Sequence, residues 1–170
     1  MIILGIGSNL KSNFGNRFSN IDLAISYLNA YQIKTLKMSS YYESESYPNK
    51  NDPKFINVII SVETSLQPID LMSVLIFVEE KLERKRLKKN EPRTCDIDII
   101  DYKQQILNFT YKGEDLIIPH EKLQFRNFVL YPLSEIFPEW KHPKTNEKIS
   151  TIIEKLSSED RKSIYKVDNN

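Results

Sequence analysis

Residues 55–82, FINVIISVETSLQPIDLMSVLIFVEEKL, change their apolar periodicity midway, and this change decides the fold class. Up to residue 64 the apolar residues alternate, as in a strand that places one face on a core. From Pro68 onward they recur at helical spacing, and proline is tolerated in the first turn of a helix. The stretch therefore predicts a strand followed by an amphipathic helix. The core-facing residues are Ile56, Val58, Ile60 and Val62 in the strand and Leu71, Val74, Leu75, Val78 and Leu82 in the helix.

Similar patterns lie on both sides of this stretch. Residues 2–8 predict a buried strand, residues 16–28 a helix, and residues 33–42 and 94–101 two further strands. Residues 44–53 are rich in turn formers and predict a loop. The order β-α-β-β-α-β predicts an α+β fold with a ferredoxin-like core, in which two helices cover one face of an antiparallel sheet. The other face would then be open for a ligand.

The remaining residues add smaller elements to this core. Residues 104–108 predict a turn into a short hairpin, residues 128–136 a helix, and residues 149–156 a short final helix. We predict one domain over residues 1–158, followed by a polar C-terminal tail over residues 159–170.

Composition excludes several classes of protein. The chain has 170 residues, a formal net charge of +1 and 40% hydrophobic residues, which fits one domain with a sizeable core. No window approaches the roughly 18 consecutive apolar residues of a membrane span, and the apolar start is expected to be a strand and not a signal peptide. One cysteine, Cys95, and two histidines offer no soft-metal cluster. We predict a cytoplasmic, monomeric protein with neither a membrane nor a nucleic acid as partner.

The small net charge hides a local asymmetry. Residues 81–93 hold seven basic and two acidic residues, a balance of +5, so the rest of the chain carries −4. Three of the six arginines, Arg84, Arg86 and Arg93, fall in this segment. Arginine grips phosphate through two parallel hydrogen bonds, which lysine cannot copy. The simpler alternative is a solvated helix end whose cations complement the helix dipole.

The most informative motif is Asp96-Ile97-Asp98. Residues i and i+2 of a strand point to the same side, so both carboxylates meet on one face. Two such carboxylates repel each other unless a cation lies between them, and Mg²⁺ commonly takes one or two carboxylates together with substrate phosphates. An acidic strand beside a basic segment is what phosphoryl transfer requires. The alternative is a pair of carboxylates that face water on an edge strand.

Two other functions remain open from the residues alone. RRM-type RNA-binding modules share the βαββαβ order, although no RNP1-like string is present and Asp96 and Asp98 would repel a nucleic-acid backbone. A different Mg-dependent nucleotide transferase on a similar fold is the second alternative. A lone histidine such as His120 is weak evidence for either.

A series of motifs occurs in the order and near the spacing of a known family. The chain resembles 6-hydroxymethyl-7,8-dihydropterin pyrophosphokinase over roughly residues 2–156. This resemblance implies transfer of pyrophosphate from ATP to a pterin hydroxymethyl group in folate biosynthesis. The motifs are Gly7-Ser8-Asn9-Leu10, Ser39-Ser40-Tyr41-Tyr42, Phe55-Ile56-Asn57, Glu79 with Arg84-Lys85-Arg86, Pro92-Arg93-Thr94-Cys95-Asp96-Ile97-Asp98, Pro119-His120 and Arg126-Asn127-Phe128-Val129-Leu130.

The resemblance also implies roles for individual residues. Asp96 and Asp98 would hold two Mg²⁺ ions, and Arg84 and Arg93 would act with them in catalysis. The implied ATP-binding residues are Glu79, Arg84, Arg86, Arg93, Ile99, His120 and Arg126. The implied pterin-binding residues are Ser44, Glu45, Tyr47, Phe55, Asn57 and Phe128, with the two phenylalanines stacking on the ring.

The chain departs from the family pattern at two places. Many members carry Thr-Pro-Pro-x-Gly where this chain has Ser44-Glu45-Ser46-Tyr47-Pro48, and a Trp near the place of Asn90. We predict weaker closure over the pterin without loss of chemistry.

Overall fold

The computed structural model describes residues 1–47, 49–85 and 91–169. The predicted β-α-β-β-α-β order is confirmed, with the second strand divided in two. The core elements are β1 (Ile2–Ser8), α1 (Arg17–Ala30), β2 (Lys34–Met38), β3 (Tyr41–Ser44), β4 (Phe55–Glu63), α2 (Pro68–Lys81) and β5 (Asp96–Tyr102). After the core come β6 (Leu107–Tyr111), β7 (Glu114–Ile118), a 3-10 turn (Leu123–Phe125), α3 (Asn127–Ile136), α4 (Ile149–Glu154), α5 (Ser158–Lys162) and β8 (Ile164–Val167).

The main sheet has the strand order expected of a ferredoxin-like fold. Its strands run β5-β1-β4-β3-β8, with β2 also paired to β4, and every pairing is antiparallel. The predicted strand 33–42 is interrupted at residues 39–40. There Ser39 Oγ accepts a hydrogen bond from the Ile59 amide, and the Ser39 amide donates to the Ile59 carbonyl. The predicted hairpin is confirmed as the separate pair β6–β7.

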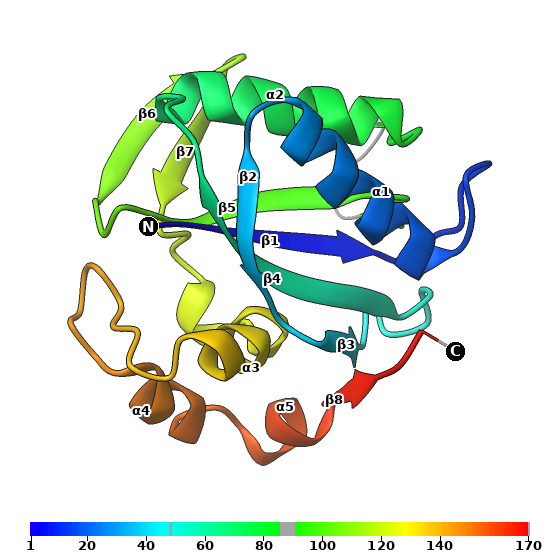
Figure 1. Cartoon of the computed structure of the whole chain (residues 1–170). Coiled ribbons are helices and arrows are strands. Elements are labelled where there is room, and N and C mark those ends of the chain that lie inside the picture. The colour runs from blue at the N-terminus through cyan, green and yellow to red at the C-terminus, as the bar shows by residue number, and fades with distance from the viewer. Residues whose placement is uncertain (48, 86–90, 170) are drawn as a thin grey trace.

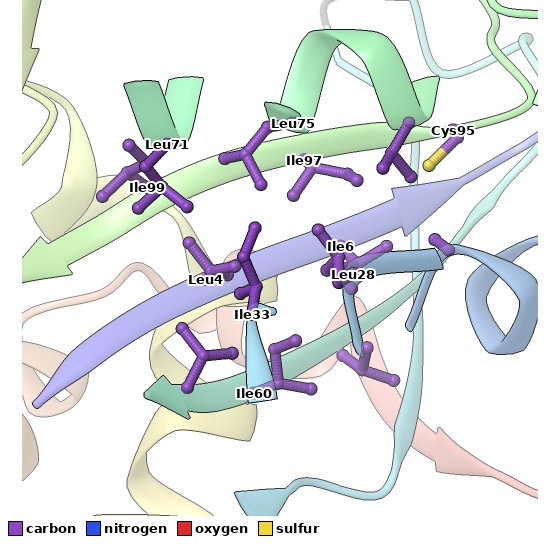
Figure 2. Packing of buried hydrophobic residues seen from close by; sticks show 14 of the residues in the cluster. Leu4, Ile6, Leu28, Ile33, Ile60, Leu71, Leu75, Cys95, Ile97 and Ile99 are labelled. Atoms are coloured by element: carbon purple, nitrogen blue, oxygen red, sulfur yellow. The ribbon is translucent and has the colours of Figure 1, made fainter. Parts of the chain in front are cut away.

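One face of the sheet packs against α1 and α2, as the periodicity predicts (Figure 1). The alternate strand residues and the helix stripes interlock there into one apolar cluster (Figure 2). Both helices begin where the sequence allows a start, because the Asn16 side chain accepts from the Ser19 amide and Pro68 occupies the first turn of α2. Full burial of a leucine such as Leu75 stabilises the fold by about 1.5–3 kcal/mol.

The second face of the sheet is not open along its whole length, so that prediction is wrong in part. Helices α3 and α4 cover it and form a second apolar cluster with Ile3, Ile59 and Ile100 (Figure 1). The apolar residues on this face of β1 and β4 require such a cover, because exposing them would forfeit the free energy of their burial. The uncovered end carries Gly7, Asn57 and the two carboxylates of β5.

The C-terminal residues differ from the predicted polar tail. Residues 158–162 form α5, and β8 pairs with the outer edge of β3, where Ile164 lies opposite Ser44. Ile164 is buried in this position. The mostly polar composition of the segment conceals the strand, because backbone pairing to an exposed sheet edge needs few apolar side chains. Within the described ranges, no helix is long and apolar enough to cross a membrane.

Candidate active site

The uncovered end of the sheet has a flat floor because its central strand carries glycine. Gly7 of β1 lies between Asn57 of β4 and Asp96 of β5 in the strand register. A Cβ atom at Gly7 would lie 3.3 Å from Asn57 Oδ1 and 3.4 Å from a ring carbon of Phe55. Any side chain at this position would therefore cover the floor and crowd Asn57 and Phe55. Sequence reasoning did not assign Gly7 this role, although its place in the alternation of β1 put it on this face.

Asp96 and Asp98 project from the same face of β5, as their spacing predicts. The Asp98 side chain exposes 51% of its surface, and that of Asp96 exposes 21%. Protein atoms surround the Asp98 carboxylate closely enough that desolvation, followed by the charge of Asp96, raises the pKa of Asp98. Nearby arginines oppose this shift. The pair is thus a partly exposed acidic site in which keeping both carboxylates charged costs free energy.

Three of the predicted arginines reach these carboxylates. Arg84 Nη1 lies 2.5 Å from Asp96 Oδ1, and Arg93 Nη2 lies 2.9 Å from Asp96 Oδ2. Arg126 Nη1 lies 3.4 Å from Asp98 Oδ2. Arg86 and Asn90 lie outside the described residues. We call the set Glu79, Arg84, Arg93, Asp96, Asp98 and Arg126 the charged cluster.

Glu79 is the buried anchor of the charged cluster. Its side chain from α2 exposes 2% of its surface, and its Oε1 accepts from the Ile97 amide at 2.7 Å and from Arg84. One carboxylate thereby fixes both Arg84 and the backbone of β5 at Ile97, the residue between the two aspartates. The structure brings Glu79, a predicted ATP-binding residue, into the cluster through Arg84 and the β5 backbone.

Replacing Glu79 with alanine should lower the free energy of unfolding by about 2 kcal/mol, because Arg84 loses one of its two carboxylate partners and the buried Ile97 amide loses its acceptor. Urea denaturation measures this loss. Glu80→Ala, on the exposed side of the same helix turn, is the matched control and should change stability by about 0.5 kcal/mol or less. Equal losses in the two variants would contradict the anchoring role.

Asn9 holds the backbone of Arg93, a role that the sequence analysis missed. The Arg93 amide donates to Asn9 Oδ1 at 2.6 Å, and the Arg93 carbonyl accepts from the amides of Asn9 and Leu10. The Asn9 side-chain amide donates to the Pro53 carbonyl at 3.0 Å. Asn9 is 3% exposed. The available signal was its place in Gly7-Ser8-Asn9-Leu10, directly after a buried strand.

The predicted pterin residues divide into buried and exposed groups. Asn57 Nδ2 donates to Ser44 Oγ at 2.9 Å and to the Tyr42 carbonyl, and both Asn57 and Ser44 are buried. Glu45 is exposed and pairs with Lys50, while Tyr47 is 76% exposed. The structure therefore brings Ser44 and Asn57 together and leaves the ring of Tyr47 in solvent.

The two predicted stacking rings each lie under an arginine of the charged cluster. The Arg93 guanidinium lies 5.1 Å from the centre of the Phe55 ring, and that of Arg126 lies 5.7 Å from the centre of the Phe128 ring. Both are cation–π contacts. The predicted pterin and phosphate subsites are therefore contiguous.

His120 and Ile99 have different surroundings. His120 Nε2 lies 2.9 Å from Arg126 Nη2, and its Nδ1 accepts from the Lys122 amide, so this histidine joins the charged cluster through Arg126. Ile99 is 5% exposed and packs in the apolar cluster on the opposite face of β5. Any contact of Ile99 with a nucleotide must involve its backbone.

The fold and the charged cluster define a ferredoxin-like α+β protein with paired carboxylates and arginines at one end of its sheet. Residues 3–138 match the family model described as 7,8-dihydro-6-hydroxymethylpterin-pyrophosphokinase (HPPK). The chain belongs to this family, which confirms the resemblance found in the sequence.

Individual relatives agree with this assignment. The chain is 35% identical to the 2-amino-4-hydroxy-6-hydroxymethyldihydropteridine pyrophosphokinase of Synechocystis sp., over 91% of this chain and 75% of that protein. It is 37% identical to the protein of the same name from Aquifex aeolicus, over 84% of this chain and 83% of that protein. The Folic acid synthesis protein fol1 of Pneumocystis carinii is 39% identical over 91% of this chain.

Several of the similar proteins are much longer. The chain spans 20% of the length of the Pneumocystis carinii protein. Among solved structures, the Plasmodium falciparum HPPK-DHPS crystal structure with pteroate aligns with a TM-score of 0.70 at 16% identity, over 89% of this chain and 43% of that one. This likeness confirms the fold.

Proposed function

We propose that the chain transfers a pyrophosphoryl group from ATP to the hydroxymethyl oxygen of 6-hydroxymethyl-7,8-dihydropterin, giving AMP and the pterin diphosphate for tetrahydrofolate synthesis. The observation that carries this proposal is that the charged cluster adjoins the floor at Gly7 and Asn57: Gly7 pairs in register with both Asn57 and Asp96, and Arg93 lies over the Phe55 ring. Phosphate-binding chemistry would then lie beside a surface that suits a flat ring. The family match and the names of the relatives support it.

The two aspartates fit a magnesium site that is completed by substrate. In the described ranges, no group of three or more His, Cys, Asp or Glu side chains could hold a metal ion. Mg²⁺ needs one or two carboxylates and takes its other ligands from phosphates and water. Desolvation and the charge of Asp96 raise the pKa of Asp98 although Arg126 lies beside it, and a bound divalent cation would favour the charged carboxylate. Asp96 and Asp98 would hold two Mg²⁺ ions, which when bound neutralise phosphate charge and acidify the pterin hydroxyl.

The arginines of the charged cluster would exchange carboxylate for phosphate when ATP binds. Arg84 and Arg93 pair with Asp96. With Mg²⁺ held by this carboxylate, the two guanidinium groups would turn to phosphate oxygens. Arg93 Nε is buried and has no hydrogen-bond partner among the described residues. A buried donor without a partner costs free energy that a phosphate oxygen would restore. Arg126 would add a second cationic contact, and His120 would assist it by a hydrogen bond. Glu79 would keep Arg84 in place.

The pterin would lie on the floor formed by Gly7 and Asn57. The Asn57 amide group already donates to Ser44 and Tyr42, so its Oδ1, which faces Gly7, is the atom left to accept from a pterin N–H. Phe55 and Phe128 would stack on the ring. Glu45 and Tyr47 would contribute through the loop backbone. The hydroxymethyl group would then point toward the charged cluster.

Replacing Gly7 with alanine should weaken pterin binding about tenfold, because the new methyl group would displace Asn57 Oδ1 and occupy the floor. Calorimetric titration with the pterin measures the effect. Mg-ATP affinity in the same variant is the internal control and should stay unchanged. Unchanged pterin affinity would place the ring elsewhere.

The proposed reaction is tested by mixing the chain with ATP, Mg²⁺ and the pterin and separating the nucleotides. AMP should form when all three are present and should disappear with EDTA. Formation of ADP, or turnover without the pterin, would contradict the proposal. The family match argues against the RNA-binding alternative, while a monomeric state and a cytoplasmic location stay predictions from the sequence.

A further inference from the structure

The C-terminal segment Ser158–Val167 contacts three separate parts of the proposed pterin site. We call this segment, α5 with β8, the C-terminal brace. It lies beyond residues 3–138, which match the family model, and it runs along β3 and α3 at the edge of the sheet (Figure 1). Its contacts reach the strand with Ser44, the loop before Phe55 and the start of the helix with Phe128.

The first contact is a strand pairing. β8 pairs with β3 so that Ile164 lies opposite Ser44 and Tyr165 opposite Glu43. Ser44 Oγ in turn accepts the hydrogen bond from Asn57 Nδ2. The pairing therefore fixes the strand end that orients the amide of Asn57, because an unpaired strand end is free to fray.

The second contact ties the loop that leads into Phe55. The Tyr165 hydroxyl donates to Glu43 Oε1 at 2.6 Å and accepts from Lys54 Nζ at 2.9 Å. Lys54 directly precedes Phe55 in the chain. Lys50 of the same loop forms an ion pair with Glu159 of α5. Two points of the loop are thus held by the C-terminal brace.

The third contact holds the start of α3. Asn127 lies between Arg126 and Phe128 and is 8% exposed. Its Nδ2 donates to the Asp160 carbonyl at 2.6 Å and to Ser163 Oγ at 2.9 Å. A buried amide with two such bonds fixes the first turn of the helix, and with it the Phe128 ring.

From these contacts, and on the basis of the proposed function, we propose that the C-terminal brace is a positioning element for pterin recognition, with Asn127 and Tyr165 as its positioning residues. The brace contacts the pterin side of the site at Ser44, at the loop before Phe55 and beside Phe128, and it adjoins the phosphate side at Arg126, which precedes Asn127. On the phosphate side, Glu79 holds the β5 backbone and Asn9 holds Arg93. Loss of a brace contact should therefore weaken recognition of the pterin more than that of ATP.

The test uses two variants of the full chain, each with a matched control. Asn127→Asp removes both amide donors with little change in shape, and Asn108→Asp adds the same charge on the exposed strand β6. Tyr165→Phe removes one hydroxyl from a ring that is 44% exposed. Tyr31→Phe does the same at 42% exposure, at the end of α1, where the hydroxyl bonds to no residue that the structure describes.

We expect Asn127→Asp to raise the KM of the pterin about tenfold and Tyr165→Phe about threefold, with kcat and the KM of ATP within about twofold of the wild type. Both controls should match the wild type. Amide exchange in residues 49–54 should also be faster in Tyr165→Phe than in Tyr31→Phe.

Two results would overturn the role of the C-terminal brace in an active enzyme: an unchanged pterin KM in both variants, or a parallel rise in the KM values of pterin and ATP. If Asn127→Asp fails to fold, as judged by circular dichroism, Tyr165→Phe decides alone. A wild-type chain that makes no AMP from ATP and the pterin would instead overturn the proposed function, so the two failures are distinguishable.

Discussion

Asp98→Asn should lower kcat by about a thousandfold or more, because it removes one of the two carboxylates that would hold Mg²⁺ against the transferring phosphates. The change is nearly isosteric. The side chain is half exposed, and the one ion pair that it makes within the charged cluster is the 3.4 Å contact with Arg126. The fold should therefore survive, and steady-state kinetics at saturating ATP and pterin measure the loss.

Asp70→Asn is the matched control for this variant. Asp70 is exposed in the first turn of α2, away from β5, so its kcat should equal that of the wild type. Isothermal titration should also show weaker Mg-ATP binding in Asp98→Asn. An Asp98→Asn variant with near-normal turnover would remove Asp98 from the metal site.

Arg93→Ala should lower kcat/KM for ATP by about a thousandfold, because a guanidinium on a transferring phosphate contributes on that scale. Arg93 suits this role since its backbone is fixed by Asn9 and its buried Nε has no partner among the described residues. The rate should be measured at subsaturating ATP with saturating pterin.

A second variant at Arg93 and one control elsewhere separate the effect of the side chain's charge from that of its geometry. Arg93→Lys keeps the charge but loses the planar pair of donors, so it should recover little of the rate. Lys144→Ala removes an exposed cation outside both the charged cluster and the C-terminal brace and should leave kcat/KM unchanged. Full activity in Arg93→Lys would show that charge alone suffices there.

The strands and the two large helices could be predicted because their burial is periodic. The stripes on β4 and α2 each face one core, so spacing alone identifies them. The break at residues 39–40 could not be predicted in this way, because Ser39 bonds to Ile59 on another strand. The second apolar cluster was not predicted: the face that carries Ile3 and Ile59 was expected to be open, and the helices that cover it are determined by tertiary packing.

The candidate site, like the fold, could be predicted only where sequence spacing determines the arrangement. The spacing of Asp96 and Asp98 predicts their common face, and the basic segment predicts cations beside them. The role of Asn9 could not be read from spacing, since its partner Arg93 is 84 residues away. The exposure of Tyr47 and the burial of Ile99 likewise follow from three-dimensional packing, which the motif order does not encode.

The position of the label after reaction with radioactive ATP tests the central claim most directly. With Mg²⁺ and the pterin present, label in the γ-phosphate of ATP should appear in the pterin product, and label in the α-phosphate should remain in AMP. That result shows attack at the β-phosphorus with transfer of both terminal phosphates. The γ-label appearing in a pterin monophosphate with release of ADP, or the α-label appearing in the pterin product, would contradict the account.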